Sequence, residues 1–231
     1  MTDNFAAASK QHLLDRLRKL SWLSPEQICA IGEASRVVEV KRGASVYREQ
    51  DRSDLLYVML SGMGALWMVD GDRRVLMSVV GPGDITGISA LLADGPRPFR
   101  CEGLSDCKVA ALTAASFRSV VFDEPKTFEK GLQATFGRWE TLLKRYAQFM
   151  TLNAKGRLAM ALLELSDRFG VNNARGRLLP FLVSHAMLAT MVGASRQHVT
   201  MQLVDFEREH SVMRENRRLV VIPERLREAM N

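Results

Sequence analysis

Residues 188–207, LATMVGASRQHVTMQLVDFE, decide the fold of the C-terminal part of the chain. A short apolar run ends at Gly193, and a second run with a polar outer face follows Ser195. Glycine adopts the left-handed conformation that ends a helix at the lowest cost, and serine is a preferred N-cap. We therefore predict one helix over residues 185–192, capped by Ser184, and a second helix over residues 196–209.

The spacing within this stretch is typical of a helix-turn-helix. Ala189 places a small residue where the two helices cross, Gly193 forms the turn, and Val199 packs beneath the second helix. The predicted buried stripe consists of Val192, Val199, Leu203 and Phe206.

The outward face of the second helix carries side chains that recognise bases. Arginine pairs bidentately with guanine and glutamine with adenine, and the first turn of a recognition helix is where these contacts are made. The predicted DNA contacts on this helix are Ser195, Arg196, Gln197, His198, Thr200 and Met201.

Residues 210–223, HSVMRENRRLVVIP, predict a β-hairpin wing after the second helix. The turn ENRR separates two β-rich stretches, and Arg214, Arg217 and Arg218 are expected to face phosphates. From Ala154 onward the chain has 12 Lys/Arg and 8 Asp/Glu, so this part is the more basic. The sequence therefore predicts a winged helix-turn-helix domain over residues 153–231 that binds double-stranded DNA.

The first half of the chain has a different pattern. Residues 37–112 consist of short apolar stretches separated by glycine and aspartate turns, which is typical of an antiparallel barrel or sandwich. VDGDRRV, residues 69–75, is a hairpin signal. Residues 10–34 are predicted to be helical, with Ser24 as N-cap and Pro25 in the first turn.

A long helix is predicted over residues 124–149, before a hinge at residues 152–154. Its large apolar residues recur three or four apart, over about seven turns, and need a large facing surface. A second copy of this helix is the favoured partner, and an ordinary core helix is the alternative. The predicted dimer contacts are Phe136, Trp139, Leu143 and Tyr146.

A further amphipathic helix is expected to end at Gly170, and residues 171–177 are expected to form a loop. The predicted fold class is thus α+β. Residues 1–123 form a double-stranded β-helix (jelly-roll) sensor domain, residues 124–152 the dimerisation helix and residues 153–231 the DNA-binding domain.

Composition sets the remaining limits. The chain has 231 residues, of which 47% are hydrophobic, and a net charge of +6. No apolar run reaches membrane-spanning length, the N-terminus lacks a signal-peptide core, and three cysteines form no disulfide framework. We expect a cytoplasmic protein without a membrane partner.

The order of barrel, long helix, hinge and winged helix resembles the CRP/FNR family of bacterial transcription regulators, from about Leu20 onward. Four stretches carry the resemblance: residues 43–66, GASVYREQDRSDLLYVMLSGMGAL; 79–92, VVGPGDITGISALL; 153–165, NAKGRLAMALLEL; and the opening stretch. The resemblance implies a cyclic-nucleotide-binding-type barrel, a homodimer along the long helix and a palindromic DNA site. It also implies RNA polymerase as a partner.

The departures from the family concern its ligands. Ile88 stands where nucleotide-binding members carry the glutamate that holds ribose, and Pro98-Phe99 stand at the Arg-Ser pair that holds phosphate. Arg97 and Arg100 flank that pair. We therefore predict no cofactor and no cyclic AMP binding in the usual mode. The candidate effector-pocket residues are Ile88, Arg97, Phe99 and Arg100.

The cysteines bear on the other cofactors of the family. Only Cys29 lies near the N-terminus, so the family's iron–sulfur cluster is not expected, whereas haem stays open because its ligands vary.

The recognition helix departs from the family as well. Arg196 keeps the family's first arginine, Gln197 replaces its glutamate and Met201 its second arginine. We therefore expect a half-site that differs from the family's common one near these contacts.

Three alternative functions compete with this interpretation. A cupin-type metalloenzyme needs several histidines in the barrel, and none lies between residues 37 and 112, so we predict no metal, no catalytic residues and no enzyme. A redox-responsive regulator would act through Cys101 and Cys107. A ligand-sensing scaffold would use its winged helix to bind protein, and the exposed Arg and Gln side chains argue against that.

Overall fold

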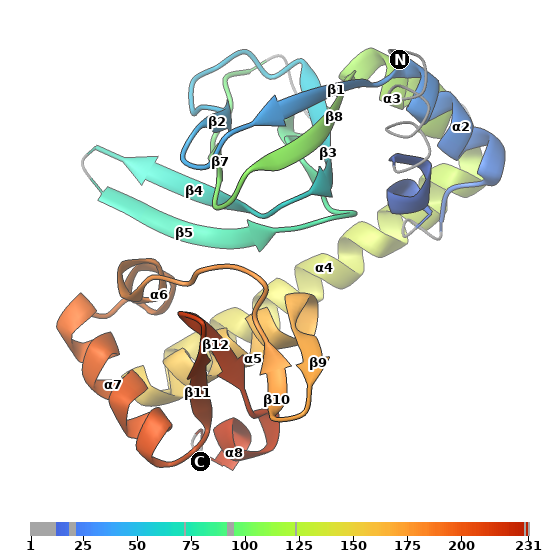
Figure 1. Cartoon of the computed structure of the whole chain (residues 1–231). Helices are drawn as coiled ribbons and strands as arrows, with labels where there is room; N and C mark the ends of the chain where they lie inside the picture. The colour runs from blue at the N-terminus through green and yellow to red at the C-terminus, as the bar shows by residue number, and fades with distance from the viewer. Residues whose placement is uncertain are drawn as a thin grey trace. The chain divides into compact units, whose positions relative to one another are not determined.

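The computed structural model describes residues 13–18, 22–71, 73–91, 95–122, 124–228 and 230. The chain divides into two compact units, with a boundary inside one long helix between Arg138 and Trp139; the short segment Arg74–Leu76 is grouped with the second unit. The first unit contains a β-barrel with short helices, and the second contains helices and a small sheet (Figure 1). This is the α+β class that the sequence predicts.

The chain enters the first unit through helices. Residues 13–17 are helical, and α2 follows over Pro25–Ala34. Ser24 caps α2 as predicted, because its hydroxyl accepts from the N–H of Gln27 while the Gln27 side chain accepts from the N–H of Ser24. Residues 10–12 and 19–21 of the predicted helical stretch lie outside the described residues.

Two four-stranded sheets form the barrel. Their strand orders are β1-β8-β3-β6 and β2-β7-β4-β5, and the registered pairs are antiparallel. Such a pair of sheets is the predicted jelly-roll. The elements are β1 (Arg36–Val40), β2 (Ser45–Tyr47), β3 (Leu55–Ser61), β4 (Gly64–Asp70), β5 (Arg73–Val80), β6 (Ile85–Thr86), the short 3₁₀ helix η1 (Ile88–Leu91), β7 (Arg100–Gly103) and β8 (Cys107–Thr113).

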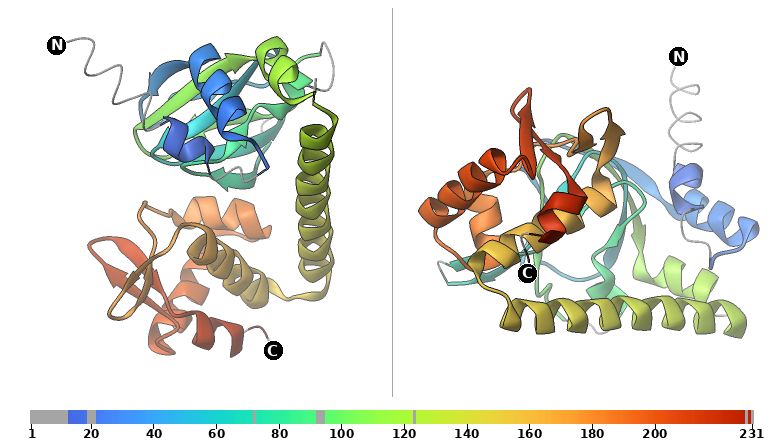
Figure 2. Two further views of the ribbon diagram at one scale, coloured as in Figure 1. Left: turned by 90° about the vertical axis from the view of Figure 1, so that its right-hand side faces the viewer. Right: turned by 90° about the horizontal axis from the view of Figure 1, so that it is seen from below.

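The central strand β3 is buried on both faces. Tyr57 and Met59 belong to the cluster between the sheets, whereas Leu56, Val58 and Leu60 belong to a second cluster with the helices. Alternate residues of a strand point to opposite faces, so the continuous apolar run of β3 is required by the helices on its outer side. Figure 2 shows α2 and α3 (Ala114–Val121) against that side of the strands.

The long helix α4 covers Pro125–Thr151, close to the predicted residues 124–149, and runs without a break (Figure 2). Two residues separate it from α5 (Ala154–Phe169), which Asn153 caps by accepting from the N–H of Gly156.

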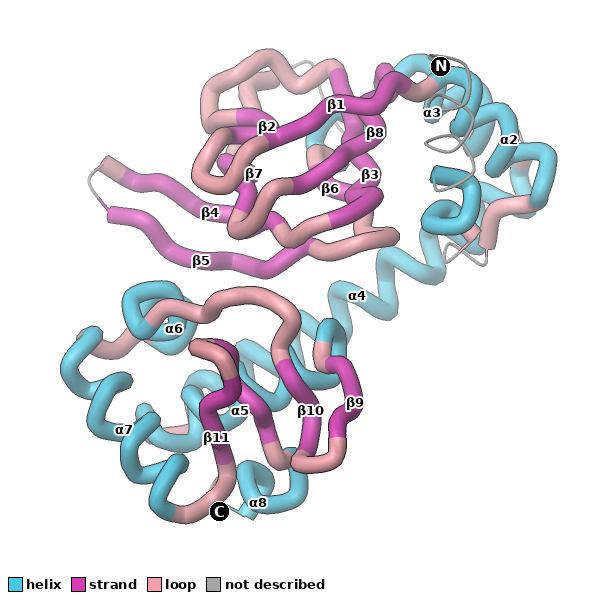
Figure 3. The backbone as a smooth tube through the Cα atoms, viewed as in Figure 1, coloured by secondary structure: helices cyan, strands magenta, loops and turns pink. Residues whose placement is uncertain are grey.

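The second unit is built on α5. Its sheet has the order β11-β12-β10-β9, and Figure 3 shows β9, β10 and β11 beside the helices. Its other elements are β9 (Val171–Asn173), β10 (Gly176–Leu178), α6 (His185–Val192), α7 (Arg196–Arg208), β11 (Val212–Glu215), β12 (Arg218–Val221) and α8 (Pro223–Glu228).

The prediction of a loop over residues 171–177 is wrong. This segment forms most of the hairpin β9–β10, and β10 pairs with β12 through Arg177↔Val221 and Leu178↔Val220. Each strand has only three residues, which is too short for an alternating pattern. The pairing with β12 is long-range, so the local sequence does not reveal it.

Candidate nucleic-acid interface

The turn between α6 and α7 has the predicted geometry. Gly193 adopts φ 62° and ψ 44°, and its N–H donates to the carbonyl of Ala189. A β-carbon at this position would come within 3.2 Å of Cζ of Phe149. Ser195 caps α7 by accepting from the N–H of His198 at 3.1 Å, and Ser184 caps α6 by accepting from Met187. The helix-turn-helix prediction is confirmed.

The inner face of the helix-turn-helix is fully buried. Met187, Leu188 and Ala189 on α6 lie in the interior of the second unit, which fixes α6 in place. The predicted stripe is confirmed in Val192, Val199, Leu203 and Phe206.

The outer face of α7 is available for a partner. Arg196, Gln197 and Met201 are exposed, and His198 is half-buried at its edge. Ser195 is exposed but acts as the cap, so its hydroxyl is already an acceptor.

Thr200 differs from its neighbours because its hydroxyl is bonded within the domain. It contacts the backbone carbonyl of Arg196 at 2.8 Å and Nδ1 of His185 at 2.7 Å. Its polar atom is therefore turned toward α6, and the role of Thr200 as a base contact remains a prediction.

His185 links α6, α7 and β11. The Nη2 atom of Arg214 lies 3.2 Å from Nε2 of His185, and a guanidinium can only donate, so Nε2 is the acceptor. The imidazole is therefore neutral, its Nδ1–H donates to Thr200, and Thr200 donates to the carbonyl of Arg196.

The surroundings of His185 favour this neutral state. Its pKa is lowered from the ordinary value, first by burial and then by the charges of Arg214 and Arg196. Arg214 also donates from Nε to Glu207 at 2.6 Å. Arg214 thus holds the wing to α7, although the sequence suggested that it faces phosphates. Only the fold brings these residues together, so no sequence signal could have found this set.

The wing is the predicted hairpin. β11 and β12 pair from Val212↔Val221 to Glu215↔Arg218, and the two turn residues Asn216 and Arg217 have φ 49° and 66°. Two consecutive positive φ angles define the type I′ turn that suits the twist of a hairpin. Arg217 and Arg218 are exposed at this tip, as a contact with phosphates requires.

The interior of the barrel contains Arg97. This side chain is only 1% exposed, and its guanidinium carbon lies 4.3 Å from the ring centre of Tyr47 and 5.5 Å from that of Tyr57. Nη2 donates to the carbonyl of Leu55 at 2.7 Å. Nη1 is buried and has no hydrogen-bond partner among the described residues. Burial raises the pKa of Tyr47 to about 12, so that phenol stays neutral.

The four candidate effector residues differ in their surroundings. Ile88 is 41% exposed, Phe99 is half-buried, and Arg100 pairs with Glu49 at 2.6 Å and with Glu102. Arg97 flanks the Arg-Ser position in the sequence, and its side chain lies inside the barrel, so its role toward an effector stays a prediction. The segment before β7 is irregular, so spacing alone does not show which side chain enters.

Cys101 and Cys107 are both buried in the cluster between the sheets. Burial raises the pKa of the Cys101 thiol to about 12 and also raises that of Cys107. Since the thiolate is the reactive form, this setting gives both residues the character of inert core cysteines.

The long helix α4 carries an apolar face that this chain leaves uncovered. Phe136 is 63% exposed and Trp139 is 55% exposed. Among the side chains of α4 that the structure describes, the large apolar ones that are exposed are Phe128, Leu132, Phe136, Trp139, Leu142, Leu143, Tyr146 and Met150.

Metal binding and membrane insertion also bear on function. Within the part of the chain that the structure describes, no three His, Cys, Asp or Glu side chains gather as a metal site would require. The same described residues contain no helix of the length and hydropathy needed to span a membrane.

A barrel joined by a long helix to a winged helix-turn-helix defines a class of DNA-binding regulator. Two family models match this chain: the cyclic nucleotide-binding domain over residues 37–124 and the Crp-like helix-turn-helix domain over residues 156–229. The chain belongs to the CRP/FNR family, and it is a DNA-binding transcription regulator, not an enzyme.

Individual proteins agree with this assignment. The chain is 27% identical to the CRP-like cAMP-activated global transcriptional regulator of Mycobacterium tuberculosis. The alignment spans 195 residues and covers 84% of this chain and 87% of the relative. Two solved structures share the fold. FixK2 from Bradyrhizobium japonicum has a TM-score of 0.73 at 20% identity, over 85% of this chain and 98% of its own. A CRP-family regulator from Thermus thermophilus has a TM-score of 0.68 at 20% identity, over 84% of this chain and 96% of its own.

Proposed function

We propose that this regulator acts as a homodimer on a palindromic site of two half-sites. The apolar face of α4 is the observation that carries the proposal. Leu132, Phe136, Trp139, Leu143 and Tyr146 alternate at spacings of four and three, which is the seam of a two-stranded coiled coil. A helix of 27 residues is roughly 40 Å long, so a second copy would bury a continuous strip of these side chains.

Each protomer is proposed to place α7 in the major groove of one half-site. Arg196 and Gln197 in the first turn would contact base edges, and Arg217 and Arg218 would contact phosphates. The dimer would set the two recognition helices about 34 Å apart, which corresponds to one turn of DNA. RNA polymerase is the further partner that a regulator of transcription would need.

We propose that this regulator does not bind cyclic AMP in the family's usual mode. It either has no effector or responds to a different molecule. Ile88 supplies no carboxylate for a ribose, and it is 41% exposed. Arg97 offers one buried guanidinium nitrogen, Nη1, without a hydrogen-bond partner among the described residues, so a signal molecule in the barrel would be a small anion. Such a molecule would shift the population of the DNA-binding state, with rotation at residues 152–153 between α4 and α5.

The dimer is tested by breaking its seam. Trp139→Glu should convert the protein from a dimer to a monomer in analytical ultracentrifugation at micromolar concentration, because it would bury a charge in an apolar interface. Gln148→Glu adds the same charge on the opposite side of α4 and should leave the dimer intact. A monomeric wild type would overturn the proposal.

The DNA site is tested by selection from a random duplex pool. The expected product is a palindrome whose half-site centres are about 10–10.5 base pairs apart, as expected for a symmetric dimer. Arg196→Ala should broaden the selected half-site. Recovery of single, unpaired half-sites from a dimeric protein would refute the palindrome.

The effector proposal is tested by calorimetry on protein unfolded, dialysed and refolded to remove bound molecules. Cyclic AMP should give no saturable heat. Tight cyclic AMP binding that Arg97→Met abolishes would overturn the proposal and show that Arg97 holds the phosphate of cyclic AMP.

A further inference from the structure

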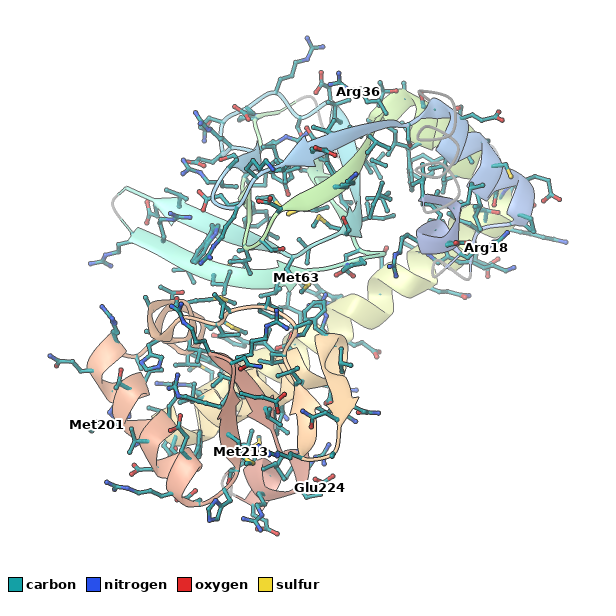
Figure 4. The ribbon with its side chains drawn as sticks, viewed as in Figure 1. Arg18, Arg36, Met63, Met201, Met213 and Glu224 are labelled. Atoms are coloured by element: carbon teal, nitrogen blue, oxygen red, sulfur yellow. The ribbon has the colours of Figure 1, made fainter. Side chains whose placement is uncertain are left out.

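The outward face of α7 is not uniformly polar. Met201 is 59% exposed and Val204 is 40% exposed, and the two lie about one turn apart on the helix that carries Arg196 and Gln197. Figure 4 shows Met201 on the outer side of α7, away from the strand that bears Met213. Isolated apolar side chains are common on protein surfaces, so the meaning of this pair depends on its position on the helix.

Met201 continues the stripe that begins with Gln197. Four residues turn an α-helix by about 400° and advance it by about 6 Å, so the two side chains leave the helix in nearly the same direction. Base pairs are spaced by about 3.4 Å. Met201 would therefore lie roughly two base pairs from the position that Gln197 contacts.

The chemistry of Met201 selects its target in the groove. A thioether and a valine offer no hydrogen-bond donor, and a base edge with an amino or carbonyl group held against them would lose its water without gaining a bond. The major groove has one apolar group, the 5-methyl group of thymine. The flexible, polarisable methionine side chain can follow that group closely.

We propose that Met201 determines specificity by packing on the 5-methyl group of a thymine in each half-site, with Val204 beside it. This inference rests on the proposed function, because it requires α7 in the major groove.

The test removes the methyl group alone. After the half-site has been selected, each thymine in turn is replaced by uracil, and affinity is measured by fluorescence anisotropy at fixed salt. One replacement should weaken wild-type binding by about 3- to 10-fold, because the burial of one methyl group is lost. A thymine outside the half-site serves as the control and should show no change.

Variants of Met201 then test whether this residue is the one that contacts the methyl group. Met201→Ala should reduce the uracil penalty to less than about 2-fold, whereas Met201→Leu should retain it, because leucine also packs on a methyl group. Met201 is exposed, so both variants should keep the far-ultraviolet spectrum of the wild type.

The outcomes separate the two proposals. A uracil penalty of the same size in Met201→Ala, or no sensitive thymine at all, overturns the role of Met201 while DNA binding stands. If the wild type bound no duplex sequence-specifically, the proposed function itself would be overturned.

Discussion

The guanidinium carbon of Arg97 lies 4.3 Å from the ring centre of Tyr47, inside the barrel. The phenol of Tyr47 in turn contacts the hydroxyl of Thr86 at 2.6 Å, so the ring is held in place from its polar end. The buried charge of Arg97 is partly compensated, because its guanidinium lies against an aromatic face and one of its nitrogens donates to the carbonyl of Leu55. Arg97 therefore places a positive charge in the interior of the barrel.

Replacement of Arg97 should separate the effect of its volume from that of its charge. Arg97→Ala would leave a cavity beside the stacked rings of Tyr47 and Tyr57 and should lower the free energy of unfolding by about 2–5 kcal/mol. Arg97→Met keeps much of the volume and removes the charge, so its cost should stay near about 1 kcal/mol. Urea denaturation followed by circular dichroism measures both. An equal decrease in the two variants would show that the charged contacts dominate.

The cysteines should differ sharply in reactivity. Cys29 is exposed on α2, whereas Cys101 and Cys107 are buried and their pKa values are raised by burial. A chromogenic thiol reagent at about pH 8 should therefore titrate one thiol per native chain and all three in denaturant. Cys29→Ser should remove the native signal. Rapid modification of two thiols in that variant would instead support the redox-responsive alternative.

Any side chain at Gly193 should lower the free energy of unfolding. Its positive φ disfavours other residues, and an added β-carbon would approach Phe149. Gly193→Ala should lower the free energy of unfolding by about 1–2 kcal/mol, and Gly193→Val should lower it further. Gly137, on exposed α4 with open space around it, is the matched control. Gly137→Ala should raise stability by up to about 1 kcal/mol, so decreases at both positions would contradict this account.

The parts of the fold that were predictable from sequence depend on local chemistry. Ser24, Ser184 and Ser195 cap helices through contacts three residues away, and Gly193 needs its left-handed turn whatever surrounds it. These features are local, so a pattern in one sequence indicates them.

The parts that could not be predicted depend on long-range contacts. The hairpin β9–β10 exists because β10 pairs with β12, and His185 meets Arg214 across 29 positions of the sequence. Arg97 enters the barrel from an irregular segment, where no period of two fixes the direction of a side chain. In each case the deciding partner lies in another element.

His185 should make stability depend on pH. Its pKa in the folded protein lies below the ordinary value of 6.5, so the unfolded chain binds a proton more readily. The free energy of unfolding should therefore be constant above about pH 6.5 and fall as the pH decreases below it. His185→Gln keeps one donor and one acceptor and should reduce this dependence. The same pH profile in His185→Gln and the wild type would contradict the prediction.

The wing arginines should set the salt dependence of DNA binding without setting its specificity. Removal of one phosphate contact lowers the slope of log affinity against log salt by about 0.9, so Arg218→Gln should lower it by about 1.8 in a dimer. At Arg217 the substitution should be Arg217→Asn, because φ is 66° and asparagine tolerates that conformation. Both variants should bind all duplexes more weakly by a similar factor, since phosphates carry no sequence information. Arg227→Gln on α8 removes the same charge from an exposed position outside the wing and should leave the slope nearly unchanged. An equal decrease in all three variants would mean that DNA senses the overall charge of the domain instead of a contact at the hairpin tip.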